Sequence, residues 1–207
     1  PNIKLTVFAL DEASVSELQP YDVEIKTFEN KFVEENNLVD IQSEKFGLMM
    51  CYKFEAIYRE LQNNKYVVYI DGDIVVKKDF TDYILSKISH RDIIFQNDKN
   101  PRKPNREMLC AGFMFIKSNK KTLKFFDIRN VDVEYVSQLI NHDQTYINKN
   151  KNRFKYQALP LDLFPNGAHY YTKSEEINPF MIHFNFLIGG EAKKNKMIEH
   201  NEWYLNS

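Results

Sequence analysis

The stretch YVVYIDGDIV, residues 66–75, decides how this sequence is interpreted. Its first five residues are apolar on both faces, which is typical of a central strand that other elements cover on two sides. This predicted strand runs directly into Asp71, Gly72 and Asp73. Two neighbouring carboxylates repel each other, and each is costly to bury unless a positive charge lies beside it. The stretch therefore raises the question of which positive group the two aspartates face.

The composition is that of a globular chain with a sizeable core. The chain has 207 residues, of which 43% are hydrophobic and 14% aromatic, and we expect a single domain over residues 1–207. The net charge is -1, so no global field favours nucleic acid, and we expect no nucleic-acid partner. No apolar run is long enough to cross a bilayer and no signal-peptide pattern is present, so we expect no membrane segment in this chain.

The two cysteines, Cys51 and Cys110, are too few for a disulfide framework. A reducing compartment is the simplest interpretation, and we expect a cytoplasmic location. The chain begins with Pro1, so the loss of an N-terminal anchor stays open.

Strand patterns alternate with helical ones along the chain. The patterns predict strands at 3–10, 21–28, 66–70, 91–97, 112–117 and 179–184, helices at 46–61 and 133–149, and a loop at 97–108. Such alternation favours an α/β fold with a largely parallel sheet. Ligands of these sheets bind beyond the carboxyl ends of the strands, which is where the two aspartates stand.

Asp71 and Asp73 are candidate metal ligands. Alternate residues of a strand point to the same face, so we expect both carboxylates to aim at one point, with Gly72 leaving room for a close approach. Mg²⁺ and Mn²⁺ take carboxylate oxygens and share the rest of their shell with phosphates. An ordinary Asp-Gly turn after a strand accounts for the same residues.

The sequence IHFNFLIGGEAKKNK near the C-terminus supplies a second group of candidates. His183 follows a predicted strand, and its imidazole could complete a metal shell. Gly189 and Gly190 precede Lys193, and a glycine pair followed by lysine could cradle and neutralise a phosphate. A half-buried histidine and a solvated lysine are the plain alternatives.

Seven motifs carry a family resemblance: VFALDE, YKFEAIYREL, YVVYIDGDIVV, CAGFMFIK, HDQTYIN, LPLDLFPNG and HFNFLIGGEAK. In this order the chain resembles the nucleotide-diphospho-sugar transferases of the A-type glycosyltransferase fold, most of all glycosyltransferase family 77 and more weakly family 8. The likeness extends over nearly the whole chain. It implies a single Rossmann-like nucleotide-binding domain with a mainly parallel central sheet flanked by helices. It also implies metal-dependent transfer of a hexose or pentose from a UDP-sugar to a glycan or protein-linked acceptor, with the anomeric configuration retained.

The resemblance assigns roles to individual residues. Asp71, Asp73 and His183 would hold Mn²⁺ or Mg²⁺ on the donor diphosphate. The other donor-binding positions that it implies are Ala9, Leu10 and Asp11 beside the uracil, Lys53, Gly72, Cys110, Ala111, Gly112, Gly189 and Lys193. Lys53 lies on or beside the apolar stripe of its predicted helix, so its ammonium needs a phosphate or carboxylate partner unless it reaches solvent.

The catalytic roles follow from the same resemblance. Asp143 would bind sugar hydroxyls, Gln144 would face the anomeric carbon, and Lys193 would stabilise the charge that grows on the leaving diphosphate. Thr145 stands where family 8 usually has a further aspartate.

Three other classes of protein share parts of this pattern. Haloacid-dehalogenase-type phosphatases also place Asp-x-Asp after an apolar strand, but they add a later acidic pair, and this chain has no adjacent Asp-Asp. A sugar-phosphate nucleotidylyltransferase would open with a glycine-rich loop, whereas FALDEAS has no glycine. A non-catalytic carbohydrate or Ca²⁺-binding module could use the acidic pair, but it would leave Lys53 and Lys193 without a purpose.

Overall fold

The structure is a computed structural model, and it describes residues 4–28, 44–101, 105–138 and 142–205. The chain forms two compact units. The first comprises Pro1–Asn64 and Leu123–Tyr146, and the second comprises Lys65–Thr122 and Ile147–Ser207. The single domain expected over residues 1–207 stays a prediction.

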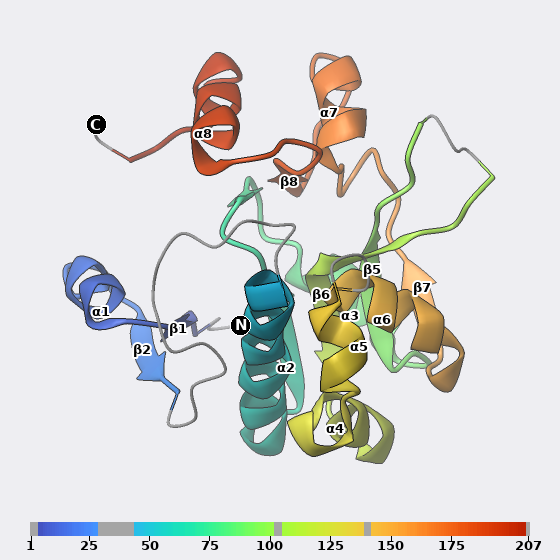
Figure 1. Cartoon of the computed structure of the whole chain (residues 1–207). Coiled ribbons are helices and arrows are strands. Elements are labelled where there is room, and N and C mark those ends of the chain that lie inside the picture. Colours follow the sequence, from blue (N-terminus) through green and yellow to red (C-terminus); the bar gives the residue numbers. More distant parts are fainter. Residues whose placement is uncertain (1–3, 29–43, 102–104, 139–141, 206–207) are drawn as a thin grey trace. The chain divides into compact units, whose positions relative to one another are not determined.

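A small parallel sheet opens the first unit. Strand β1 (Thr6–Ala9) pairs in parallel with β2 (Glu24–Thr27), and helix α1 (Glu12–Leu18) connects them (Figure 1, blue). Asp11 caps α1, because its side chain accepts a hydrogen bond of 2.6 Å from the backbone N–H of Ser14. This bond also lowers the pKa of Asp11. The predicted strand, turn and helix start are therefore confirmed.

The long helix of the first unit is α2 (Glu44–Asn63). Phe54, Ile57 and Leu61 are buried at the helical spacing that the sequence predicts. The ring of Phe54 packs on aromatic rings from α4 (Lys120–Phe126) and from the start of α6 (Asp143–Asn150), namely those of Phe125, Phe126 and Tyr146. This aromatic contact forms a core of the first unit.

The single helix expected over 133–149 is wrong. Helix α5 (Val133–Ser137) ends where Gln138 takes an extended backbone, and α6 begins at Asp143, with residues 139–141 outside the described part of the chain. A short 3₁₀ helix, η1 (Ile128–Asn130), precedes α5. The end of α5 packs directly on α2, because a Cβ atom at Gly47 would lie 2.5 Å from the Cα atom of Ser137. The apolar period of the sequence does not report this end of the helix.

The central sheet belongs to the second unit and has the strand order β3-β6-β5-β7. Its strands are β3 (Tyr66–Ile70), β5 (Ile93–Asn97), β6 (Leu109–Lys117) and β7 (Tyr156–Ala158). Three of them run in one direction, but β6 is antiparallel to both β3 and β5. The expectation of a mainly parallel sheet therefore fails at β6. The described residues between β5 and β6 contain no helix, and a connection without a crossover helix returns the chain antiparallel.

Apolar side chains from the central sheet and helix α3 (Thr81–Ile88) build the main core of the second unit. Its fully buried members include Ile84, Ile94, Phe113 and Phe164. Strand β6 is buried along almost its whole length, as the apolar run GFMFIK predicts.

A second, smaller sheet joins two distant parts of the chain. Strand β4 (Ile74–Val76) pairs antiparallel with β8 (Met181–His183), and Ile74 lies opposite His183. Helices α7 (Gly167–Lys173) and α8 (Gly190–Glu199) lie next to β8 (Figure 1, orange and red). The residues that join them in one apolar cluster are Tyr170, Ile182, Phe184 and Met197. A short 3₁₀ helix, η2 (Lys151–Arg153), precedes β7. Among the described helices, none combines the length and the apolar character that a membrane span requires.

Candidate functional site

The two aspartates of the opening motif lie in a turn between two sheets. Strand β3 ends at Ile70 and β4 begins at Ile74, so Asp71 and Asp73 are turn residues and not alternate residues of one strand as expected. The N–H of Asp71 donates to the carbonyl of Gly112 at 2.8 Å, and the N–H of Phe184 donates to the carbonyl of Asp73 at 2.9 Å. Neighbouring segments thus hold the turn at both aspartates.

Asp71, Asp73 and His183 come together in the second unit as the sequence predicts. Their ligand atoms all lie within 4.8 Å of one another. The pairing of Ile74 with His183 brings the imidazole beside the turn. The hydroxyl of Tyr69 donates to Asp71 Oδ1 at 2.8 Å and orients that carboxylate. Two carboxylates and one imidazole suit Mn²⁺ or Mg²⁺, so the donor set fits the expected metal.

An ammonium and an imidazole flank the carboxylate of Asp73. Lys193 Nζ lies 2.7 Å from Asp73 Oδ2, and His183 Nε2 lies 3.2 Å from Oδ1. Burial by itself would raise the pKa of Asp73, but His183 and then Lys193 hold it well below its usual range. Lys193 stands in the first part of α8, whose start is marked by Gly189 at a φ of 89°. The carboxylate of Asp73 is therefore ionised, and Lys193 and His183 lie beside its two oxygens.

Gly112 makes room for two of the candidate ligands. A Cβ atom at this position would lie 2.5 Å from Asp71 Oδ2 and 2.5 Å from His183 Cε1. The metal-ligand candidates fill the space beside Gly112, and the donor-binding role of this residue stays a prediction. Gly72 differs, because a Cβ atom there would meet nothing within 4 Å.

Lys53 and Asp143 form a buried ion pair in the first unit. Lys53 Nζ lies 2.5 Å from Asp143 Oδ2, and the two side chains are 7% and 6% exposed. The expectation that Lys53 requires an anionic partner is met here by a carboxylate. Burial would raise the pKa of Asp143, but the charge of Lys53 and a contact with His142 lower it. Contacts of Lys53 with the donor and of Asp143 with the sugar stay predictions.

The other residues singled out in the sequence have less distinctive surroundings. Ala9 is buried at the end of β1, Leu10 is exposed, and Asp11 serves as the cap of α1. Cys110 and Ala111 are buried on β6, while Gln144 is half-buried in the first turn of α6. The donor-binding roles of these residues and of Gly189, and the catalytic role of Gln144, stay predictions.

Sequence reasoning missed two residues that contact the cluster. Tyr69 binds Asp71, and Gln96, which is completely buried on β5, lies 2.7 Å from His183 Nδ1 through its Oε1 atom. In the sequence, Gln96 stands out only as a polar residue directly after the apolar residues Ile93, Ile94 and Phe95. An amide buried at such a position needs hydrogen-bond partners.

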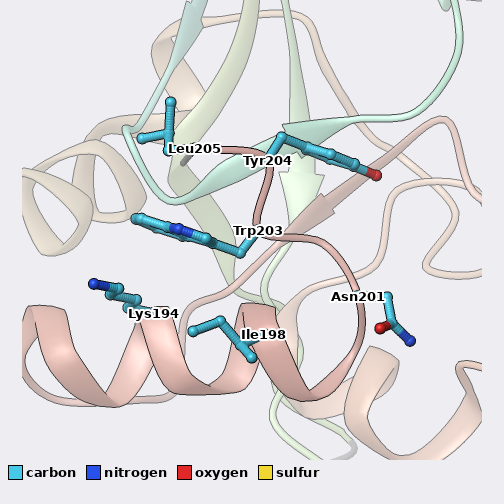
Figure 2. A pocket seen from close by; sticks show the side chains of 6 residues that line it. All are labelled: Lys194, Ile198, Asn201, Trp203, Tyr204 and Leu205. Atoms are coloured by element: carbon cyan, nitrogen blue, oxygen red, sulfur yellow. The ribbon is translucent and has the colours of Figure 1, made fainter. Parts of the chain in front are cut away.

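A separate open hollow of about 450 Å³ lies between α8 and the C-terminal segment of the described chain (Figure 2). Its lining consists of Lys194, Ile198, Asn201, Trp203, Tyr204 and Leu205. Lys194 Nζ lies 5.3 Å from the centre of the Trp203 ring. None of the three metal-ligand candidates lines this hollow.

Comparison with known proteins agrees with the geometry. A family profile for nucleotide-diphospho-sugar transferases matches residues 3–197. The chain is 30% identical over 205 residues to a UDP-galactose:fucoside alpha-3-galactosyltransferase of Dictyostelium discoideum, and the match covers 87% of this chain. It covers 32% of that relative, so the chain spans about a third of the relative's length.

Solved structures show the same architecture. The galactosyltransferase LgtC, in complex with donor and acceptor sugar analogues, superposes with a TM-score of 0.59 at 12% identity, covering 88% of this chain and 76% of LgtC. A glycosyltransferase involved in glycosylation of the major capsid of PBCV-1 superposes with a TM-score of 0.60 at 10% identity, covering 96% of this chain and 100% of that one. The expected A-type glycosyltransferase fold is therefore confirmed. With the family profile matching almost the entire length, the chain belongs to the nucleotide-diphospho-sugar transferase family.

Proposed function

We propose that this chain is a metal-dependent glycosyltransferase that moves a hexose or pentose from a UDP-sugar to a glycan or glycoprotein acceptor. The observation that carries the proposal is the convergence of Asp71, Asp73 and His183 in a member of this family. Both carboxylates and the imidazole would hold Mn²⁺ or Mg²⁺. When bound, the cation would supply positive charge to the leaving diphosphate.

Lys193 is the second support for the proposal. Its ammonium already lies beside Asp73, half-exposed, in the first part of helix α8, whose first residue is Gly190 and whose N-cap is Gly189. A diphosphate bound at this place would gain a compact positive charge and the backbone N–H groups of the first turn. Lys193 would oppose the charge that develops as the bond between sugar and phosphate breaks.

The stereochemical outcome that we propose is retention. The resemblance to families 77 and 8 implies it, and the name of the Dictyostelium relative gives an alpha linkage made from UDP-galactose. Gln144 would then support the face of the sugar opposite the leaving group, and Asp143 would bind the sugar hydroxyls. UDP-galactose is accordingly the first donor to test.

The test is release of UDP from a panel of UDP-sugars with Mn²⁺, measured with and without candidate acceptors. We expect slow release of UDP from one donor by hydrolysis, and faster release when an acceptor is present to receive the sugar. We expect turnover to stop with a chelator and to return with Mn²⁺. Hydrolysis of a phosphate monoester to inorganic phosphate, with no UDP released from any donor, would instead favour a phosphatase. Binding of a sugar or Ca²⁺ without any turnover would favour the non-catalytic module, and full turnover in chelator would remove the metal from the proposal.

A further inference from the structure

We propose that Gln96 is a positioning residue that keeps a proton on Nδ1 of His183, so that Nε2 is the nitrogen presented to the metal. The inference rests on the metal site of the proposed function. Gln96 has no exposed surface, and it approaches His183 from β5, a different strand from the one that carries the histidine. A buried amide that contacts a candidate metal ligand is expected to orient that ligand through a hydrogen bond.

The orientation of the Gln96 amide is fixed by two backbone carbonyls. Its Nε2 atom donates to the carbonyl of Pro165 at 2.8 Å and to that of Phe164 at 3.3 Å. If the amide were flipped, its oxygen would face two carbonyl oxygens and both contacts would become repulsive. The oxygen Oε1 must therefore be the atom that lies 2.7 Å from His183 Nδ1.

An amide oxygen only accepts hydrogen bonds, so the proton in this contact belongs to Nδ1 of His183. Whenever the ring is neutral, its lone pair is then on Nε2, the nitrogen that faces Asp73 Oδ1 at 3.2 Å. The hydrogen bond to Gln96 thus selects the tautomer in which the imidazole can ligate a cation together with Asp73.

Neighbouring groups reinforce this choice. Cys110 Sγ lies 3.5 Å from Nδ1, but it already accepts the N–H of Gly112 at 3.3 Å and is a weak partner. The carbonyl of Pro165 accepts both the Gln96 amide and the backbone N–H of His183, the latter at 3.2 Å. Gln96 is therefore linked to the histidine through its ring and through its backbone.

The direct measurement is the ¹⁵N spectrum of the histidine rings in the full chain, with His183 assigned by comparison with His183→Ala. We expect Nδ1 to carry a proton both without metal and with Mg²⁺ added as a diamagnetic cation, and Nε2 to lack one when the cation is bound. The opposite tautomer in the wild-type protein would overturn the inference without any variant at position 96.

Two variants at position 96 test the consequence for metal binding, measured with Mn²⁺ alone by electron paramagnetic resonance. Gln96→Met keeps the volume but removes the acceptor, and we expect Mn²⁺ affinity to fall by about 10- to 100-fold with a mixture of tautomers. Gln96→Glu keeps an oxygen that can accept the hydrogen bond from Nδ1–H of His183. We expect it to keep the tautomer and to bind Mn²⁺ within a few-fold of wild type.

The outcomes separate this inference from the proposed function. If wild-type protein does not bind Mn²⁺, the metal site fails. If wild type binds Mn²⁺ and a folded Gln96→Met binds it equally well, the metal site stands and the role of Gln96 is refuted. If Gln96→Met does not fold, the wild-type spectrum decides the question.

Discussion

Lys193 Nζ and Asp73 Oδ2 are 2.7 Å apart, so the lysine that we expect to meet phosphate is held by a carboxylate that we expect to meet metal. If a metal cation takes the place of the Lys193 ammonium beside Asp73, the ammonium must move to another partner. The pair predicts that Lys193 shifts toward the diphosphate when metal and donor bind. Removing Lys193 should therefore have opposite effects on metal binding and on turnover.

The first prediction is that Lys193→Ala binds Mn²⁺ alone more tightly, because a competing charge has left Asp73, yet turns over more slowly. We expect kcat to fall by roughly 10- to 1000-fold, the scale of one lost charge contact in the transition state. Titration with Mn²⁺ and steady-state release of UDP measure the two effects.

Two neighbouring lysines are the matched controls for Lys193. Lys194 lies over the Trp203 ring, and Lys196 pairs with Glu199. Charges at the protein surface act weakly and are screened by salt, so Lys194→Ala and Lys196→Ala should stay near wild type. Equal losses in all three variants would show that only the general charge of the helix matters.

The second prediction concerns the glycines. Gly112→Ala would push a methyl group to within 2.5 Å of Asp71 Oδ2 and His183 Cε1, so the candidate ligands must move apart. We expect Mn²⁺ affinity to fall by at least about 10-fold, on the scale of a disturbed metal shell. Gly72→Ala is the control, since its methyl group meets nothing within 4 Å and should leave metal binding intact. Similar metal binding in the two variants would contradict the role given to Gly112.

The third prediction concerns the pH dependence of stability that arises from the Lys53–Asp143 pair. The pKa of Asp143 is lowered in the folded state from its ordinary value of 3.8. Its contribution to the free energy of unfolding is therefore fully present above about pH 4 and is lost as the pH falls further. Asp143→Asn should cost about 3–5 kcal/mol at pH 7, because a buried ammonium loses its carboxylate.

Urea unfolding of wild type and Asp143→Asn between neutral pH and pH 3 measures this effect. We expect the difference in unfolding free energy to narrow as the pH falls below about 4, since the Asp143 carboxylate of the unfolded chain then binds a proton while that of the folded protein stays ionised. The double variant Lys53→Met/Asp143→Leu should recover much of the loss at pH 7, because it removes both buried charges. A difference that does not change with pH would exclude the ionised pair.

The fourth prediction separates metal ligation by His183 from packing. His183→Ala should weaken the binding of UDP in the presence of Mn²⁺ and leave it unchanged in chelator, because the imidazole would act on the nucleotide only through the cation. Calorimetry under the two conditions measures the difference. An equal loss in both conditions would show that His183 matters for the shape of the site alone.

The sequence predicts the architecture where local patterns dominate and misses it where distant contacts decide. The apolar run before Asp71 identifies β3, and the stripe containing Phe54 and Leu61 identifies α2, because burial leaves its period in the residues. The direction of β6 is not visible in its own residues, since an apolar strand reads the same in either direction. The end of α5 at Ser137, which packs on Gly47 of α2, leaves no mark in the period.

The candidate site shows the same division. Asp71, Asp73, His183 and Lys193 were identified from motif chemistry and family resemblance, and the structure brings all four together. Gln96 carries no motif, and its importance comes from a hydrogen bond to a residue far away in the sequence. Such partners are brought together by the fold, so only the folded structure reveals them.

The pairing of Ile74 with His183 has a consequence for the order of assembly. A nascent chain that has been synthesised only as far as β6 already contains both aspartates but not the histidine that completes their cluster. A contact between residues so far apart in the sequence forms late, because closing the long loop between them costs conformational entropy before the contact can stabilise the chain. Tight binding of Mn²⁺ should therefore appear only at the last stage of refolding. Mn²⁺ would then stabilise only the fully folded protein. The gain in the free energy of unfolding would grow with the logarithm of the Mn²⁺ concentration.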